Sequence, residues 1–175
     1  MRHFKDSMSQ TPLAWAVENG HEEVVRVLLS RDDIDPDKPG SDGDTPLLLA
    51  AWNGHEGVVK MLLGRDDVNP DKWDECSQTP LSLAAYRGHK GIVKMLLERS
   101  DVNPNKQNED GETPLLEAVW NGHEEVVEML LGRDDINPNQ SNNNGETPLL
   151  RAFRKGHEIV VKMLLGREDV NQQIR

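Results

Sequence analysis

Apolar residues in this chain are spaced as in short helices. In residues 45–78, Leu47 and Ala50 lie three positions apart. The following run has apolar residues at i, i+1, i+4 and i+5, namely Val58, Val59, Leu62 and Leu63. Both spacings place apolar side chains on one face of a helix. The pattern therefore predicts two short helices that pack on each other through these faces.

Residues that favour helix ends bound both predicted helices. Thr45 can cap the first helix through its hydroxyl, and Pro46 suits the first helical position, where no N–H is needed. Asn53 and Gly54 end that helix, because glycine readily adopts the left-handed conformation. His55 then begins the second helix. The short connection predicts an antiparallel helix pair.

The whole arrangement returns every 34 residues. The triplet Thr-Pro-Leu begins at Thr11, Thr45, Thr79, Thr113 and Thr147, and Gly-His and Leu-Leu keep the same step. A fixed period of about 20–50 residues is typical of small units that must stack to bury their apolar faces. We therefore expect one all-α domain over 11–175, with repeats 11–44, 45–78, 79–112, 113–146 and 147–175.

The recurring elements Thr-Pro-Leu-x-x-Ala, Gly-His, Val-Val, Leu-Leu and Asp-Val-Asn resemble the ankyrin repeat, five times over residues 11–175. The resemblance implies a solenoid of five helix-turn-helix units with β-hairpin or loop fingers that project between them. The variant Arg-Asp-Asp-Val-Asn-Pro is also similar to the long, near-identical ankyrin arrays that are common in fungal proteins.

The chain departs from the ankyrin pattern in three ways. The histidine that the family has after Thr-Pro-Leu is replaced, so its hydrogen bonds to the neighbouring turn need another donor. The replacements are Ala14, Leu48, Ser82, Leu116 and Leu150. The glycine that the family has shortly after Leu-Leu, before Asp-Val-Asn, is absent and that turn is one residue shorter, while the finger is two residues longer. We expect long fingers with tips at 39–41, 73–75, 107–109 and 141–143.

Both ends of the sequence resemble interrupted repeats. Residues 6–10 match residues 74–78 at three of five positions, so residues 1–10 are expected to form a partial finger. The last helix pair keeps apolar residues such as Ile159 where a stack normally needs a polar cap. We therefore expect a piece of a longer array, with end-to-end self-association as a further option.

Charge and composition exclude several partners. The net charge is −11, and it divides into −6, −3, 0, −6 and +3 over the five repeats. Nucleic acid is not an expected partner, because its binding requires a basic surface. The sequence shows no apolar run long enough for a membrane span and no secretory leader. Because Cys76 is the single cysteine, we expect an intracellular, cytoplasmic protein.

No residue pattern indicates a metal, a cofactor or catalysis. The Gly-His histidines recur once per repeat and lie too far apart to share an ion, so they are expected to be structural. Asp33, Asp35 and Asp37 alternate as in a calcium loop, but the bidentate glutamate is missing and turn formation explains them better. Cys76 has no histidine nearby in sequence to activate it. We therefore expect no enzyme activity.

Aromatic residues occupy positions at which the repeats differ. The fifth, eighth and ninth positions share one face of the first helix of each repeat, and this face is expected to line a concave surface. Tryptophan, tyrosine and arginine are the residues that dominate protein-interface hot spots. The candidate partner-binding residues are Trp15, Trp52, Trp73, Tyr86, Arg87, Trp120, Asn121 and Arg154. The alternative interpretation is that Trp52 and Trp120 only pack against a neighbouring finger.

These observations predict a protein-binding module that uses the concave helix face and the finger tips. Two alternatives remain open at this point. The chain could serve as a structural or self-associating scaffold segment, or as the sensor arm of a larger receptor or enzyme.

Overall fold

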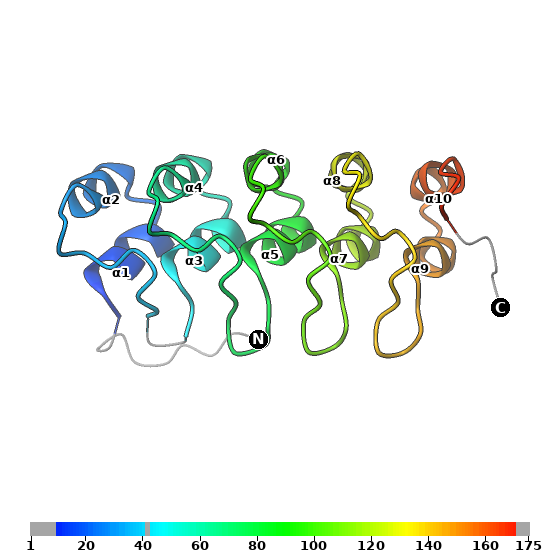
Figure 1. Cartoon of the computed structure of the whole chain (residues 1–175), viewed down its shortest axis with the longest axis horizontal. Helices are drawn as coiled ribbons and strands as arrows, with labels where there is room; N and C mark the ends of the chain where they lie inside the picture. The colour runs from blue at the N-terminus through cyan, green and yellow to red at the C-terminus, as the bar shows by residue number, and fades with distance from the viewer. Residues whose placement is uncertain (1–9, 41–42, 171–175) are drawn as a thin grey trace.

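The computed structural model describes residues 10–40 and 43–170, and within these ranges ten helices form five antiparallel pairs (Figure 1). The first helices of the pairs are α1 (Pro12–Glu18), α3 (Pro46–Asn53), α5 (Pro80–Arg87), α7 (Pro114–Asn121) and α9 (Pro148–Lys155). The second helices are α2 (Glu22–Leu29), α4 (Glu56–Leu63), α6 (Lys90–Leu97), α8 (Glu124–Leu131) and α10 (Glu158–Leu165). The predicted all-helical repeat of helix pairs is confirmed.

The helices lie in two rows. Figure 1 shows α1, α3, α5, α7 and α9 side by side in one row and the second helices in the other, with the loops projecting beyond the first row. Contacts run between helices of one pair and between neighbouring repeats, as expected for a solenoid. We call the first row the inner helices.

The inner helices begin and end where the sequence predicts. Each threonine side chain accepts the N–H three residues further on, at 3.1 to 3.3 Å. The proline after it occupies the first helical position. Gly54 adopts φ 79° at the end of α3, a conformation that a side chain disfavours. The predicted boundaries at Thr45 and Asn53 are therefore confirmed.

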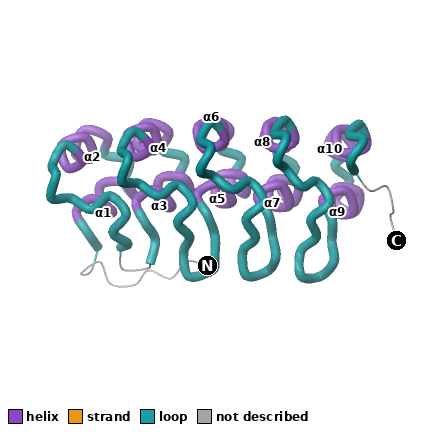
Figure 2. The backbone as a smooth tube through the Cα atoms, viewed as in Figure 1, coloured by secondary structure: helices purple, strands orange, loops and turns teal. Residues whose placement is uncertain are grey.

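The projecting fingers are loops (Figure 2), and the described residues contain no β-strand. The expected β-hairpin form is thus not found. In the finger of 107–112, Asn108 Oδ1 accepts the N–H groups of Asp110 and Glu112 at 3.0 and 2.9 Å. This side chain takes up donors that a strand ladder would use, so the tip closes as a tight turn instead. Of the expected first tip, Ser41 lies outside the described residues, as do residues 1–9 of the expected partial finger.

One apolar core runs through all five repeats, from Leu13 to Val170. Leu47, Val58 and Leu62 of the second repeat are fully buried, and the corresponding residues of the next repeats continue the same layer. Burial of an aliphatic side chain contributes about 1.5–3 kcal/mol, so each seam between repeats is stabilised mainly by these residues.

Arginines form hydrogen bonds across the seams between repeats. Arg99 holds Asp101 with two hydrogen bonds of 2.9 and 2.7 Å, and its Nη1 donates to the carbonyl of Leu63 in the preceding repeat at 3.1 Å. Arg65, Arg133 and Arg167 repeat this arrangement. The bidentate carboxylate fixes the guanidinium plane, so its remaining N–H can bond the neighbouring helix end. Each of these bonds joins the loop after a second helix to the end of the second helix of the preceding repeat.

The Gly-His pairs also join neighbouring repeats. Nε2 of His89 lies 3.2 Å from the carbonyl oxygen of Trp52, and His55 and His123 make the same contact with Glu18 and Tyr86. The His89 ring fills the space beside Gly54, where a Cβ atom would lie 2.7 Å from it. The structural role expected for these histidines is therefore confirmed.

Candidate functional site

The candidate residues lie mainly on the inner helices. Trp15 belongs to α1, Trp52 to α3, Tyr86 and Arg87 to α5, Trp120 and Asn121 to α7, and Arg154 to α9. The 34-residue period places the eighth-position residues at equivalent points of successive inner helices. Trp73 belongs to the loop between α4 and α5.

Trp52, Tyr86 and Arg87 form one cluster across the seam between α3 and α5. The rings of Trp52 and Tyr86 are stacked, with centroids 6.0 Å apart and planes at 9°. The guanidinium carbon of Arg87 lies 4.7 Å from the Trp52 ring centroid. Stacking and cation–π contacts of this kind each contribute about 0.5–1.5 kcal/mol. They hold the aromatic side chains in place.

Trp120 is covered on one side by cations of the last repeat. Lys155 Nζ lies 3.2 Å from its ring centroid and Arg151 Cζ lies 5.2 Å from it. The tryptophan is nevertheless 44% exposed, and Tyr86 is 38% exposed. Asn121 links the two residues, because its Nδ2 donates to the carbonyl of Tyr86 at 3.0 Å. We call Trp52, Tyr86 and Trp120 the aromatic row.

The other candidate residues have separate surroundings. The Trp15 ring lies 5.3 Å from the ring of His21 in its own repeat, and Lys106 Nζ lies 4.0 Å from the Trp73 ring. Both tryptophans are about half exposed. Arg154 pairs with Glu146 at 3.2 Å. The observed packing of Trp52 and Trp120 is against the following repeat's helix residues, rather than only against a finger.

The fifth-position row does not form an open surface as expected. Leu49, Leu83, Glu117 and Arg151 are buried, and Trp15 alone among the five is exposed. Finger residues contact the two charged members of this row: Glu112 and Glu146, the last residues of two fingers, both bond Arg151, and Asn108 bonds Glu117. The prediction that all three rows line the surface was wrong for this row, because Leu49 belongs to the core and the charged members bond finger residues.

A buried ionic cluster joins the last two fingers to α9. Arg151 Nη1 and Nη2 donate to Glu112 at 2.5 and 2.7 Å, and Nε and Nη2 donate to Glu146 at 2.9 and 2.8 Å. Burial opposes ionisation of Arg151, but these bonds raise the pKa of Arg151 above its ordinary value. Loss of one partner from such a buried set costs about 3–5 kcal/mol.

Glu117 lies beside this cluster, and within residues 10–40 and 43–170 it forms no salt bridge. Its Oε1 accepts long bonds of 3.5 Å from Gln78 and Asn108. The pKa of Glu117 is raised to about 7, chiefly by burial; the charge of Glu112 contributes to this rise, while the hydrogen bond from Gln78 and the charge of Arg151 oppose it. Glu117 and Arg151 both occupy the fifth position of their repeats, but the sequence gives no sign of their burial, because this position holds a different residue in most repeats.

The described residues offer little for metal or nucleophilic chemistry. Within 10–40 and 43–170, no group of three or more histidine, cysteine, aspartate or glutamate side chains is placed to hold a metal ion. Cys76 is exposed in a finger, where desolvation and then the charges of Asp74 and Glu109 raise the pKa of its thiol. A raised pKa disfavours the nucleophilic thiolate.

Protein-family models match nearly the whole length of the chain. The model described as ankyrin repeats (3 copies) matches residues 2–74 and 66–142, and the ankyrin repeat model matches residues 144–175. No curated protein matches the chain, so the resemblance to fungal arrays stays a prediction. In the described part of the chain, no helix has both the length and the apolar character needed to cross a membrane. The recurring helix pairs and these matches together show that the chain belongs to the ankyrin repeat family.

Proposed function

We propose that this chain binds a partner protein reversibly through the aromatic row, with the finger tips beside it contributing specificity. Ankyrin repeats are generally protein-interaction modules, which supports the class of function. The observation that carries the proposal is the state of Tyr86 and Trp120, which are held by neighbouring side chains and yet remain 38% and 44% exposed.

A fixed, half-exposed aromatic side chain suits recognition. Its rotamer is already restricted by side-chain contacts with a neighbouring repeat, so binding costs less conformational entropy. Aromatic and arginine side chains are also enriched in interface hot spots, where each can contribute about 2 kcal/mol or more. Arg87, Asn121 and Arg154 provide polar groups at the margin of the row. Catalysis is not part of this proposal, since binding alone explains the arrangement.

The double variant Trp52→Ala with Trp120→Ala tests the proposal. Partner proteins are first identified by crosslinking to the intact chain in the source cell, and their affinities for both forms are then compared. The control changes Lys60→Ala with Lys94→Ala, two exposed residues of the second helices α4 and α6. We expect the tryptophan variant alone to lose affinity while its helical circular dichroism is retained. Equal affinity of wild type and tryptophan variant would remove the aromatic row from the site.

A further inference from the structure

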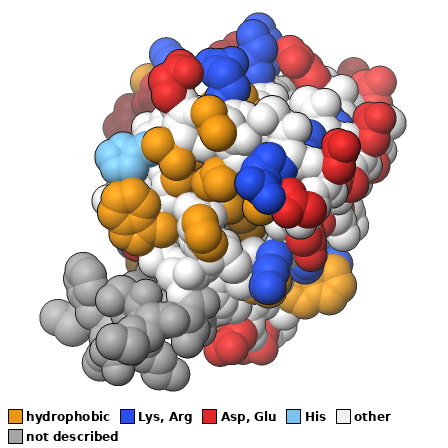
Figure 3. Space-filling model, turned by 90° about the vertical axis from the view of Figure 1, so that its left-hand side faces the viewer, with side chains coloured by type: hydrophobic (Ala, Val, Ile, Leu, Met, Phe, Trp, Pro, Cys, Tyr) orange, Lys and Arg blue, Asp and Glu red, His pale blue; other side chains and the backbone are white. Residues whose placement is uncertain are grey.

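The two ends of the repeat stack expose faces that are buried at every internal seam. Val24 in α2 is 48% exposed, whereas its equivalents Val58, Ile92, Val126 and Val160 are at most 1% exposed. Because Val160 is buried in the last repeat, the side chain at this position is covered by the preceding repeat rather than by the following one. Figure 3 shows that hydrophobic side chains gather at the middle of this end of the molecule, with charged residues above them and to their right.

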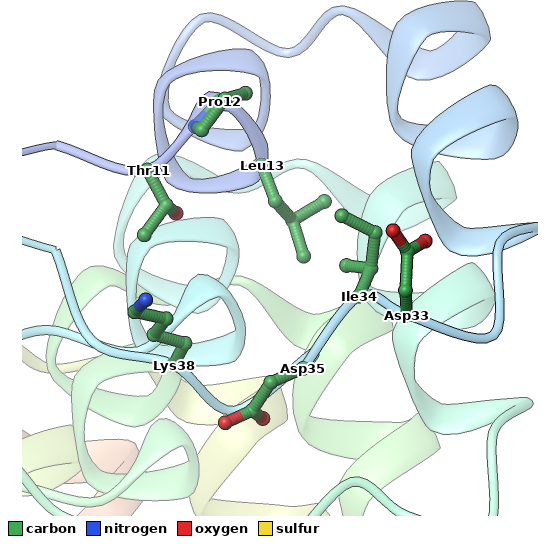
Figure 4. A pocket seen from close by; sticks show the side chains of 7 residues that line it. All are labelled: Thr11, Pro12, Leu13, Asp33, Ile34, Asp35 and Lys38. Carbon is green, nitrogen blue, oxygen red and sulfur yellow. The ribbon is translucent and has the colours of Figure 1, made fainter.

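A hollow of about 440 Å³ belongs to the same end face. It lies between the start of α1 and the loop after α2, and Leu13 and Ile34 point toward each other there (Figure 4). Ile34 is only partly buried, while Val68, Val102, Ile136 and Val170 at the same repeat position are buried. The hollow is therefore part of the surface that a preceding repeat would cover.

The polar groups of this face also lack the contacts made at internal seams. Arg31 binds Asp33 as the other arginines bind their aspartates, but no carbonyl among the described residues accepts a hydrogen bond from its Nη1. Its side chain is 60% exposed, compared with 23 to 31% for the equivalent arginines that bond a preceding repeat. His21 packs against Trp15, whereas the equivalent rings of His55, His89 and His123 contact a preceding repeat.

The opposite end presents the matching half of a seam. At Gly20, Gly54, Gly88 and Gly122 a Cβ atom would meet the next repeat's histidine ring within 2.8 Å, but around Gly156 no described atom lies within 4 Å. Phe153 is 60% exposed, although Val17, Ala51, Ala85 and Val119 at its position are fully buried. Leu165 is exposed as well, and its carbonyl is equivalent to those that Arg65 and Arg99 bond.

Charge favours contact between these two ends. The first repeat carries −6 and the last repeat +3, so a head-to-tail arrangement brings opposite charges together. One contact opposes it. At the seam between the third and fourth repeats, Lys90 pairs with Glu125 at 2.7 Å. The equivalent residues at a head-to-tail seam are Glu158 and Glu23, which repel each other.

We propose that a second copy of this chain docks head to tail, with the Gly156 end of one molecule on the Val24 end of the next. His21 then occupies the open space beside Gly156, and Arg31 bonds the carbonyl of Leu165. Such a contact is heterologous, because each molecule uses two different surfaces, and it leaves an open end that permits further addition. This inference uses surfaces other than the aromatic row and is independent of the proposed function.

Sedimentation equilibrium and light scattering over a concentration series at low salt test the proposal. We expect the average mass of the wild-type chain to rise continuously above 19.7 kDa as concentration increases. Val24→Asp should stay at the monomer mass, because it places a charge in the centre of the seam. The control Asn53→Asp adds the same charge at an exposed residue of α3 and should associate as wild type does.

A second variant should strengthen the contact. Glu158→Lys replaces the repulsion with the pairing seen between Lys90 and Glu125, and it should lower the concentration needed for association by roughly fivefold, as expected for an exposed ion pair. A constant mass of 19.7 kDa for both wild type and Glu158→Lys would overturn the proposal. Association of Val24→Asp at the wild-type concentration would place the contact elsewhere and also overturn it.

Discussion

Glu117→Gln should change how the stability of this protein depends on pH. Burial raises the pKa of Glu117 from an ordinary 4.5 to about 7. The folded state therefore keeps a proton that the unfolded state has lost, and stability falls as pH rises from about 4.5 through about 7. At roughly 1.4 kcal/mol for each pH unit, the ionised carboxylate costs the folded state about 3 kcal/mol above this window.

Glutamine has the same shape and no charge, so the variant removes this cost at high pH. The free energy of unfolding of Glu117→Gln minus that of wild type should be about 2.5 kcal/mol larger at roughly pH 8 than at roughly pH 5, which means that the variant gains stability over wild type as pH rises. Urea unfolding followed by circular dichroism measures this quantity at both pH values. Any constant effect of the amide cancels in the comparison.

A surface control separates this effect from a general change in charge. Glu128 is exposed on α8, and Glu128→Gln removes the same charge without changing a buried group. Its effect on unfolding should stay within about 0.5 kcal/mol at both pH values. If Glu117→Gln shows the same stability difference from wild type at both pH values, the reasoning from burial is wrong.

Three further substitutions have definite expected effects on urea unfolding. Asp71→Asn should stabilise the protein by about 1 kcal/mol, because Asp71 Oδ1 is buried with no hydrogen-bond partner among the described residues. Asn105, at the same position of the next repeat, donates to the carbonyl of Asp135 at 2.7 Å, and an asparagine at 71 can make the equivalent bond. A loss of stability would contradict this. Ser77 has φ 62° where other repeats have glycine, so Ser77→Gly should stabilise by up to about 1 kcal/mol, and destabilisation would show that its side chain is required. Arg151→Met should destabilise by about 3 kcal/mol or more through unpaired carboxylates; wild-type stability would refute the ionic cluster's role.

The sequence predicted most of the fold because the residues that determine it are local and repeated. Thr45, Pro46 and Gly54 bound α3 as expected, since caps act within a few residues of the helix end. The second helix was also expected, and α4 begins at Glu56, with His55 immediately before it. The form of the fingers was less predictable, because Asn108 closes its turn through its own side chain.

The candidate site was predicted only in part. The period alone places Trp52 and Tyr86 in neighbouring repeats at equivalent positions, and the structure brings their rings together. The ionic cluster could not be inferred in this way, because Arg151 and Glu112 are 39 residues apart and occupy different repeat positions. Glu117 is buried where the finger residues Gln78 and Asn108 bond it. That is a long-range property for which a repeated motif gives no signal.

The affinity of a partner for the aromatic row is the most direct test of the proposed function. Isothermal titration calorimetry of a crosslink-identified partner should show at least about thirtyfold weaker binding by the Trp52→Ala, Trp120→Ala variant, equivalent to about 2 kcal/mol for a hot spot. The Lys60→Ala, Lys94→Ala control should bind as wild type does. Equal affinity of wild type and the tryptophan variant, with helical content retained, would contradict the account.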